Sequence, residues 1–231
     1  MTTTPHLRLG SYLTNPTHSA LADTPYARLA AGDLAEWLTA WPDLHAQALK
    51  TIPHRIHPSA RIHPTAIIGD DVIIGAGARV WEFSTVRGHT LLAPGARVGF
   101  NCEITNTYLG AGTVLGHRIG LNRTLVGDQA HLSADVMAAA IHLTADMTRP
   151  GRDTFLRLPD GIYPCRTPRF GALIGDRVQT GSRFTLGPGT AIGRACHIHS
   201  HTVIGPTTVI PDHHTITPTD RPTHHARPRR G

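Results

Sequence analysis

The sequence predicts an all-β protein, a single-stranded parallel β-helix of hexapeptide repeats with a small N-terminal helical segment. Across residues 62–136 an aliphatic residue recurs at every sixth position, apart from two five-residue steps, and a small residue usually follows it. This period indicates short strands stacked coil on coil around an aliphatic interior. The same period returns from Leu173 to Ile210, so one solenoid continues after an irregular stretch. The 23 Gly and 18 Pro punctuate the repeat at its corners.

The 231 residues predict one solenoid body with added segments. We assign residues 1–55 to an irregular lead and a helical cap, 56–212 to the β-helix, 142–169 to a loop inserted in it, and 213–231 to a basic tail. Residues 1–22 show no period and are expected to be irregular. Spacings of three to five in residues 25–50 predict two short helices broken near Pro42. This segment is expected to cover an open end of the solenoid.

Composition excludes several function classes. The net charge is +6, and arginine is spread along the chain and clusters only in the tail, without interleaved aromatic residues. We therefore expect attraction to anionic small molecules, or no such partner, and no binding of nucleic acid. No apolar run approaches the roughly 18 residues that span a bilayer, and residues 1–10 lack a signal-peptide core. We therefore expect a cytoplasmic protein without a membrane partner. Three widely separated cysteines favour neither disulfides nor a zinc site.

The order of irregularities within the repeat carries a family resemblance. The segment GFNCEITNTYLG at 99–110 is similar to a family segment GNFVEIKN, and it is followed by Gly116 and His117, then Gly127 and Asp128, with both five-residue steps in the family's places. The chain thus resembles the left-handed β-helix (hexapeptide-repeat) acyltransferases. Within them it looks like the acetyltransferase half of bifunctional glucosamine-1-phosphate acetyltransferase/N-acetylglucosamine-1-phosphate uridyltransferase and its short stand-alone, sugar-nucleotidyltransferase-like relatives. The resemblance implies a left-handed helix, a homotrimer with sites between subunits, and acetyl-CoA or another acyl-CoA as co-substrate, with no tightly bound cofactor.

The resemblance also implies site residues. Acyl transfer needs a base with a pKa near neutrality, which favours histidine, and His117 matches the family's catalytic histidine. Arg87 matches an arginine that holds a sugar phosphate. Glu103 and Asn106 match acceptor-site residues, and Asn122 and His131 are further substrate-binding candidates. The alternatives are a histidine inherited without a catalytic role and an ordinary corner arginine.

Several acceptor-side positions depart from the family pattern. A family lysine is Thr105 here, a tyrosine is Gly120, an asparagine is His131, and an Asn-Tyr pair is Ala140 and Ile141. Each lost buried hydrogen bond typically costs roughly 1–3 kcal/mol, so these changes disfavour the usual acceptor, glucosamine 1-phosphate.

For coenzyme A, small residues of the later coils are candidates for pantetheine contacts and arginines for phosphate contacts. The candidates are Ser182, Ala191 and Ser200, and Arg166, Arg169 and Arg183. The alternative hypotheses are that the small residues are ordinary corner residues of the repeat and that the arginines are solvated surface charges. Alternate histidines at 197, 199 and 201 raise the possibility of a metal site, but a corner every six residues breaks the alternation, so no metal is expected.

The sequence thus predicts a coenzyme A-dependent acyltransferase, with acetyl as the expected acyl group. Its acceptor is an amine on a sugar, a sugar phosphate or another small polar molecule. Two alternatives remain open: a β-helix enzyme repurposed for chemistry without coenzyme A, and a non-catalytic trimeric scaffold.

Overall fold

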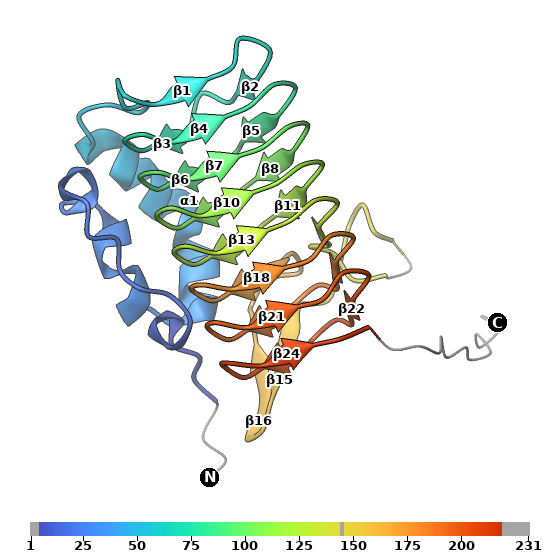
Figure 1. Ribbon diagram of the computed structural model, residues 1–231. Helices are drawn as coiled ribbons and strands as arrows, with labels where there is room; N and C mark the ends of the chain where they lie inside the picture. Colours follow the sequence, from blue (N-terminus) through green and yellow to red (C-terminus); the bar gives the residue numbers. More distant parts are fainter. Residues whose placement is uncertain (1–4, 144–145, 219–231) are drawn as a thin grey trace.

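A computed structural model describes residues 5–143 and 146–218, and its main body is a left-handed parallel solenoid with three flat faces (Figure 1). The first face stacks β1 (Arg61–Ile62), β4 (Arg79–Val80), β7 (Arg97–Val98), β10 (Val114–Leu115), β13 (His131–Leu132), β18 (Gln179–Thr180), β21 (His197–Ile198) and β24 (Thr215–Ile216). The second face stacks β2 (Ile67–Ile68), β5 (Thr85–Arg87), β8 (Glu103–Thr105), β11 (Gly120–Asn122), β14 (Met137–Ala138), β19 (Thr185–Leu186) and β22 (Val203–Ile204). The third face stacks β3 (Ile73–Ile74), β6 (Leu91–Leu92), β9 (Tyr108–Leu109), β12 (Leu125–Val126), β17 (Ala172–Ile174), β20 (Thr190–Ile192) and β23 (Val209–Ile210).

The hexad predicted the interior of the solenoid, and this prediction is confirmed. The periodic aliphatic residues stack in register, as in the run from Val80 through Val98 to Leu115, and they form one continuous buried core. The two five-residue steps both fall at the corner between the second and third faces, the second corner. There Asn106 and Arg123 turn the chain with φ of 47° each. A shorter corner therefore leaves the register of the neighbouring strands intact.

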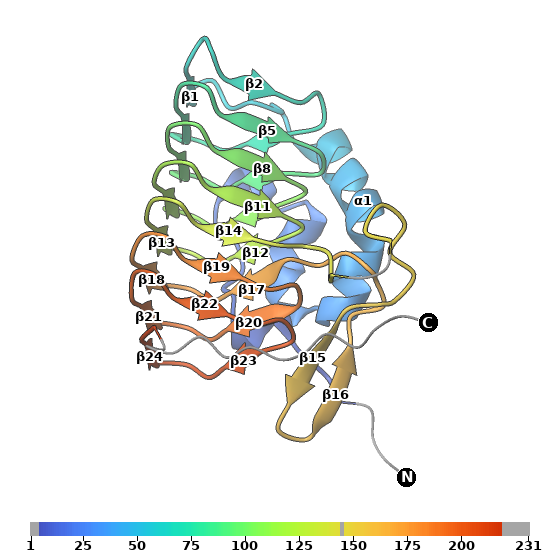
Figure 2. The same ribbon diagram turned by 90° about the vertical axis from the view of Figure 1, so that its right-hand side faces the viewer.

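The helical segment lies along the third face, and the expectation that it covers an open end of the solenoid was wrong. Outward-facing residues of this face are apolar, for example Ile73, Leu91 and Leu125, and they are buried together with the residues of the N-terminal segment. Figure 2 shows α1 (Leu34–Thr51) running beside the coils rather than over their end. A row of exposed aliphatic side chains needs a cover more than a terminal coil does, because burial of each contributes about 1.5–3 kcal/mol.

One continuous helix replaces the two helices expected around Pro42. Asp33 caps α1, with its carboxylate accepting from the backbone N–H of Ala35 and Glu36, and Pro42 lies inside the helix. An interior proline costs about 3 kcal/mol. The helix persists through it because α1 is buried on both sides of the proline, through Trp41 before it and His45 after it.

Residues 5–22 are irregular apart from short turns, and they pack against the solenoid. They form short 3₁₀ turns, η1 (Leu9–Ser11) and η2 (Ser19–Leu21), followed by η3 (Pro25–Ala31). The buried carboxylate of Asp176 holds this segment, since it accepts from the hydroxyl of Thr14 at 2.7 Å. Arg194 donates to the carbonyl oxygens of Tyr12 at 3.1 Å and Gly10 at 2.9 Å.

The insertion occupies residues 139–171 and contains a hairpin, β15 (Phe155–Leu158) and β16 (Gly161–Pro164), where an irregular loop was expected (Figure 2). Tyr163 anchors the hairpin to the start of α1: its hydroxyl donates to Asp33 Oδ1 at 2.5 Å and accepts from the backbone N–H of Ala35 at 2.6 Å. The ladder also extends one strand beyond its predicted end, to β24. Of the predicted basic tail, residues 219–231 lie outside the described residues.

Candidate active site

A groove of about 290 Å³ lies on the second face and brings three predicted site residues together. It is lined by residues of β5, β8, β11 and β14 and of the chain just after β14: Arg87, Glu103, Thr105, Gly120, Leu121, Asn122, Met137, Ala138, Ala139 and Ala140. Arg87, Glu103 and Asn122 are thus neighbours. So are three of the positions that depart from the family pattern, Thr105, Gly120 and Ala140.

The polar side of the groove is built on one ion pair. The guanidinium of Arg87 binds the carboxylate of Glu103, and its Nε donates to the hydroxyl of Thr105 at 3.2 Å. The pairing follows from register, because Thr85 lies opposite Glu103 and Arg87 lies opposite Thr105 on adjacent strands. Both charged side chains are more than half exposed, so the pair itself contributes at most about 1 kcal/mol and its arginine can be recruited by an incoming anion.

The other side of the groove is apolar, and the sequence reasoning missed its principal residue. Met137 is 51% exposed and lies over Gly120, where an added Cβ would come within 2.6 Å of its Sδ and Cε atoms. The signal was available, since Met137 takes the outward position of its strand directly beside Gly120. With three alanines beside it, this half of the groove offers few hydrogen-bonding groups.

His117 lies at the corner between the first and second faces, the first corner, on the coil that continues into β11. Its side chain is exposed, and its ring stands edge-on to Phe100 at a centroid distance of 6.5 Å. Its carbonyl oxygen accepts from the backbone N–H of Asp135 at 2.9 Å. Asp135 in turn forms a two-point ion pair with Arg118, at 2.7 and 3.1 Å, which lowers the pKa of the Asp135 carboxyl. The corner that carries His117 is therefore held by the coil before it, through Phe100, and by the coil after it, through Asp135.

The first corner also places two of the coenzyme A candidates in line with His117. Backbone hydrogen bonds connect successive coils at this corner. The carbonyl oxygens of His117, Ala134 and Ser182 each accept from a backbone N–H at the same corner of the next coil. Ser200 comes next in this column, and its hydroxyl accepts from the backbone N–H of Ser182 at 3.1 Å. One coil separates His117 from Ser182, so they are about two strand spacings, roughly 10 Å, apart along the axis.

The remaining predicted site residues are not gathered with these. Asn106 faces the second corner, where its side-chain oxygen accepts from the backbone N–H of His89 at 3.2 Å. His131 points outward from the first face, away from the groove face. Ala191 is fully buried under the N-terminal segment on the third face, so its assignment as a pantetheine contact was wrong. Arg166 and Arg169 belong to the end of the insertion, and Arg169 donates to the carbonyl oxygen of Thr148 at 3.2 Å.

None of the three cysteines is positioned as a nucleophile. All are buried and free, and burial raises the pKa of each thiol, that of Cys165 to about 12. Cys102 lies under the first corner with its sulfur 3.7 Å from the carbonyl oxygen of Gly116. Although Cys102 is far from His117 in sequence it is close in space, but its thiol points into the solenoid while His117 is exposed.

The alternate histidines of the last coils do not converge. His197 is on β21 of the first face, whereas His199 and His201 belong to the following corner. In the part of the chain that the structure describes, no group of three or more His, Cys, Asp or Glu residues is arranged to hold a metal ion.

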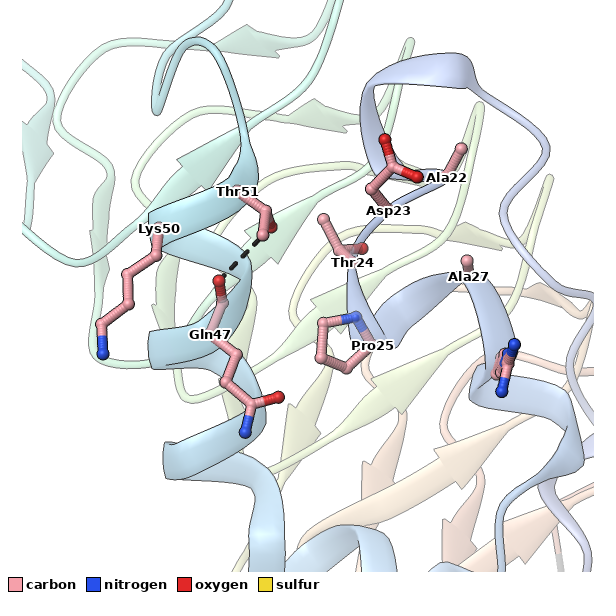
Figure 3. A pocket seen from close by; sticks show the side chains of 9 residues that line it. Ala22, Asp23, Thr24, Pro25, Ala27, Gln47, Lys50 and Thr51 are labelled. Carbon is pink, nitrogen blue, oxygen red and sulfur yellow. Dashed lines mark hydrogen bonds between the residues drawn. The ribbon is translucent and has the colours of Figure 1, made fainter.

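A second hollow of about 590 Å³ lies between residues 22–28 and the last turns of α1 (Figure 3). It is lined by Ala22, Asp23, Thr24, Pro25, Ala27, Arg28, Gln47, Lys50 and Thr51. None of the predicted site residues lines it, and the side chain of Lys50 points away from the facing segment. We therefore place the candidate active site at the groove and the first corner.

Known proteins share parts of this sequence. The family model described as the GMPPB C-terminal domain matches residues 51–145, the coils that carry the groove and His117. A putative uncharacterized acetyltransferase, YaiX of Escherichia coli K12, is 26% identical over 124 residues, which cover 54% of this chain and 49% of that protein. The chain thus spans about half the length of the curated relatives it matches. The expected resemblance to the hexapeptide-repeat acyltransferases is confirmed.

Two solved structures of acyltransferases are similar to this chain at low sequence identity. UDP-N-acetylglucosamine acyltransferase from Campylobacter jejuni is 16% identical with a TM-score of 0.43, covering 69% of this chain and 66% of that one. The N-acyltransferase AntD from Bacillus cereus, in complex with dTDP and 3-hydroxybutyryl-CoA, is 16% identical with a TM-score of 0.39, covering 68% of this chain and 73% of that one.

Within residues 5–143 and 146–218, no helix has the length and apolar character needed to cross a bilayer.

Proposed function

We propose that this protein is an acyl-CoA-dependent acyltransferase that transfers an acetyl group to an amine of a sugar, a sugar phosphate or another small polar acceptor. The observation that carries the proposal is the placement of His117 on the same coil as Gly120 and Asn122, which line the groove. An imidazole at the rim of a groove with an arginine, a carboxylate and an amide has the groups that this reaction needs. Similarity to proteins described as acetyltransferases supports the reaction class.

In the proposed reaction the acceptor amine attacks the thioester carbonyl carbon of acetyl-CoA. His117 takes the proton that the nitrogen loses as the carbon–nitrogen bond forms. The tetrahedral intermediate then collapses, the carbon–sulfur bond breaks, and the coenzyme A thiolate leaves and is protonated. The transfer is direct, without an acyl-enzyme, because the buried cysteines have raised thiol pKa values and provide no accessible thiolate.

The acceptor is proposed to differ from glucosamine 1-phosphate. Arg87 remains available to bind an anionic group through its fork of donors, in exchange for its exposed partner Glu103. The apolar half is formed by Met137 and the alanines that follow it, and it includes Ala140, which takes the place of a hydrogen-bonding residue of the family pattern. A groove of this composition favours an acceptor with one anionic or strongly polar end and one less polar end, such as a deoxygenated amino sugar.

The active form is proposed to be a homotrimer with its sites between subunits. The second face and the first corner expose apolar side chains, including Ile67, Phe83 and Val203, at 61–74% of their surface. In such an assembly a neighbouring subunit would close the open groove. Acyl-CoA would lie along the first corner past Ser182 and Ser200, and Arg166, Arg169 and Arg183 remain candidates for its phosphates.

Release of free thiol from acetyl-CoA tests the proposal. The full chain is assayed with a panel of amino sugars, including phosphorylated and deoxy forms, and His117→Ala is expected to lower kcat at least about a hundredfold. His197→Ala is the matched control, since it removes an exposed histidine from the first face. Full activity in His117→Ala would refute the base assignment. Absence of turnover together with no thermal stabilisation by any acyl-CoA would instead favour chemistry without coenzyme A or a non-catalytic scaffold.

A further inference from the structure

The outer surface of the first face carries a ladder of three arginines at its N-terminal end. Arg61, Arg79 and Arg97 take the outward position on β1, β4 and β7, and register places each directly opposite the next. Adjacent strands are roughly 4.8 Å apart, so three positive charges are stacked at close intervals. The ladder ends at Val114, which lies opposite Arg97 on the next strand. Figure 1 shows these strands at the upper end of the solenoid.

This ladder lacks an internal counter-charge. Among the described residues, none of the three guanidinium groups forms a salt bridge or a side-chain hydrogen bond, although other arginines of the chain do, such as Arg118 and Arg194. Like charges directly opposite one another on a sheet are destabilising. A bound anion would relieve this repulsion, because a guanidinium fork pairs with two oxygens of a phosphate.

A pocket joins two of these arginines to the one exposed tryptophan. It has a volume of about 520 Å³ and is lined by Ala60, Arg61, Ile62, His63, Pro64, Arg79, Val80 and Trp81. Trp81 is 47% exposed, whereas Trp37 and Trp41 are buried under the N-terminal segment. No acidic side chain lines this pocket. Its volume falls in the usual range for a small-molecule site.

We propose that this pocket binds a nucleoside diphosphate group, with the phosphates on Arg61 and Arg79 and the base against the indole of Trp81. Two neighbouring guanidinium groups suit two linked phosphates, and an exposed indole offers a face on which any base can stack. The short ladder and the single pocket match one nucleotide rather than a strand of nucleic acid. The site lies on the first face, separate from the groove on the second face, so it does not depend on the proposed acyl transfer.

Such a group has two possible sources, a free or sugar-linked nucleotide and the adenosine diphosphate portion of coenzyme A. The full chain is therefore titrated with ADP, UDP, coenzyme A and inorganic pyrophosphate, with tryptophan fluorescence and calorimetry as readouts. Because the other two tryptophans are buried, quenching reports on Trp81. We expect ADP and UDP to quench the fluorescence and pyrophosphate to leave it unchanged. Tighter binding of coenzyme A than of ADP and UDP would identify coenzyme A as the source of the group, and tighter binding of ADP or UDP would identify a free or sugar-linked nucleotide.

Variants decide where the nucleotide binds. The double variant Arg61→Gln, Arg79→Gln is expected to weaken binding at least about tenfold, and Trp81→Leu is expected to weaken it in calorimetry. Arg177→Gln, which removes an exposed arginine from the third-to-first-face corner, should bind as the unchanged protein does. His117→Ala should also bind normally, which separates this site from the acyltransferase. Nucleotide affinity unaltered in the double variant, pyrophosphate binding as tight as that of ADP, or tighter binding of an oligonucleotide would each overturn the proposal.

Discussion

Two tyrosines stack under the N-terminal segment, and their hydroxyl groups are expected to contribute oppositely to stability. Tyr26 and Tyr108 are both buried, with ring centroids 5.9 Å apart. The Tyr26 hydroxyl accepts from Trp41 Nε1 at 3.1 Å and lies 2.7 Å from His45 Nδ1. His45 Nε2 lies 2.6 Å from the carbonyl oxygen of Asp71, which only accepts, so Nε2 carries the proton and Nδ1 accepts from Tyr26.

Tyr26→Phe therefore leaves a buried indole N–H and a buried imidazole nitrogen unpaired. Each unsatisfied group costs about 1–3 kcal/mol, so the free energy of unfolding should fall by about 2–6 kcal/mol. Tyr108→Phe is the matched control, because among the described residues the Tyr108 hydroxyl has no hydrogen-bond partner. Removing it should leave stability unchanged or raise it by up to about 1 kcal/mol.

Urea unfolding followed by circular dichroism measures both variants. Since each loses one hydroxyl from the same aromatic stack, lost packing cannot explain a difference between them. Equal destabilisation by the two substitutions would refute the reasoning, because it would mean that the network around Tyr26 contributes no more than an orphaned hydroxyl.

Two further outcomes are expected. Burial lowers the pKa of His45, so the unfolded chain binds its proton first and stability from this residue is lost as pH falls below about 6.5; unfolding measured across that range should show a shallower decline in His45→Gln, and an unchanged slope would contradict the assignment. Gly99→Ala should destabilise by about 1–3 kcal/mol, because an added Cβ would come within 1.6 Å of the carbonyl oxygen of Gly116, whereas Gly151→Ala, with open space around it, should unfold like the original chain.

The sequence determines the solenoid so well because one property, an aliphatic side chain every sixth residue, fixes both the interior and the register. It predicted the aliphatic residues that stack along the interior of the solenoid and both short corners. The prediction that the helical segment covers an open end was wrong because the outward-facing residues of the three faces were not compared with one another. Ile73, Leu91 and Leu125 are apolar where Arg61 and Arg79 are charged on the first face. Apolar outward residues recur on the third face at intervals of 18 residues or slightly fewer, and this contrast with the first face identifies the third face as the covered one.

The site was less predictable because its parts come together through register rather than through local spacing. Arg87, Glu103 and Asn122 were expected from the resemblance, and the stacking of their strands explains why they share a groove. Met137 was missed because it belongs to the next coil and matches no motif. Ala191 was misassigned because the sequence alone does not distinguish a small residue at an open corner from one that is buried under a helix.

The insertion interrupts the repeat in the sequence without interrupting the stacking of the coils. Residues 139–171 leave the solenoid at the second corner, yet β14 still pairs with β19 and β13 with β18, so the coils before and after it stack without interruption. The first corner therefore runs unbroken from His117 through Ala134 to Ser182. Substitutions and insertions next to the groove can alter what binds there, because the backbone that would align a donor thioester with His117 is held by interior residues that the groove does not use. Three of the positions that depart from the family pattern, Thr105, Gly120 and Ala140, accordingly lie at the groove, whereas His131 lies on the first face.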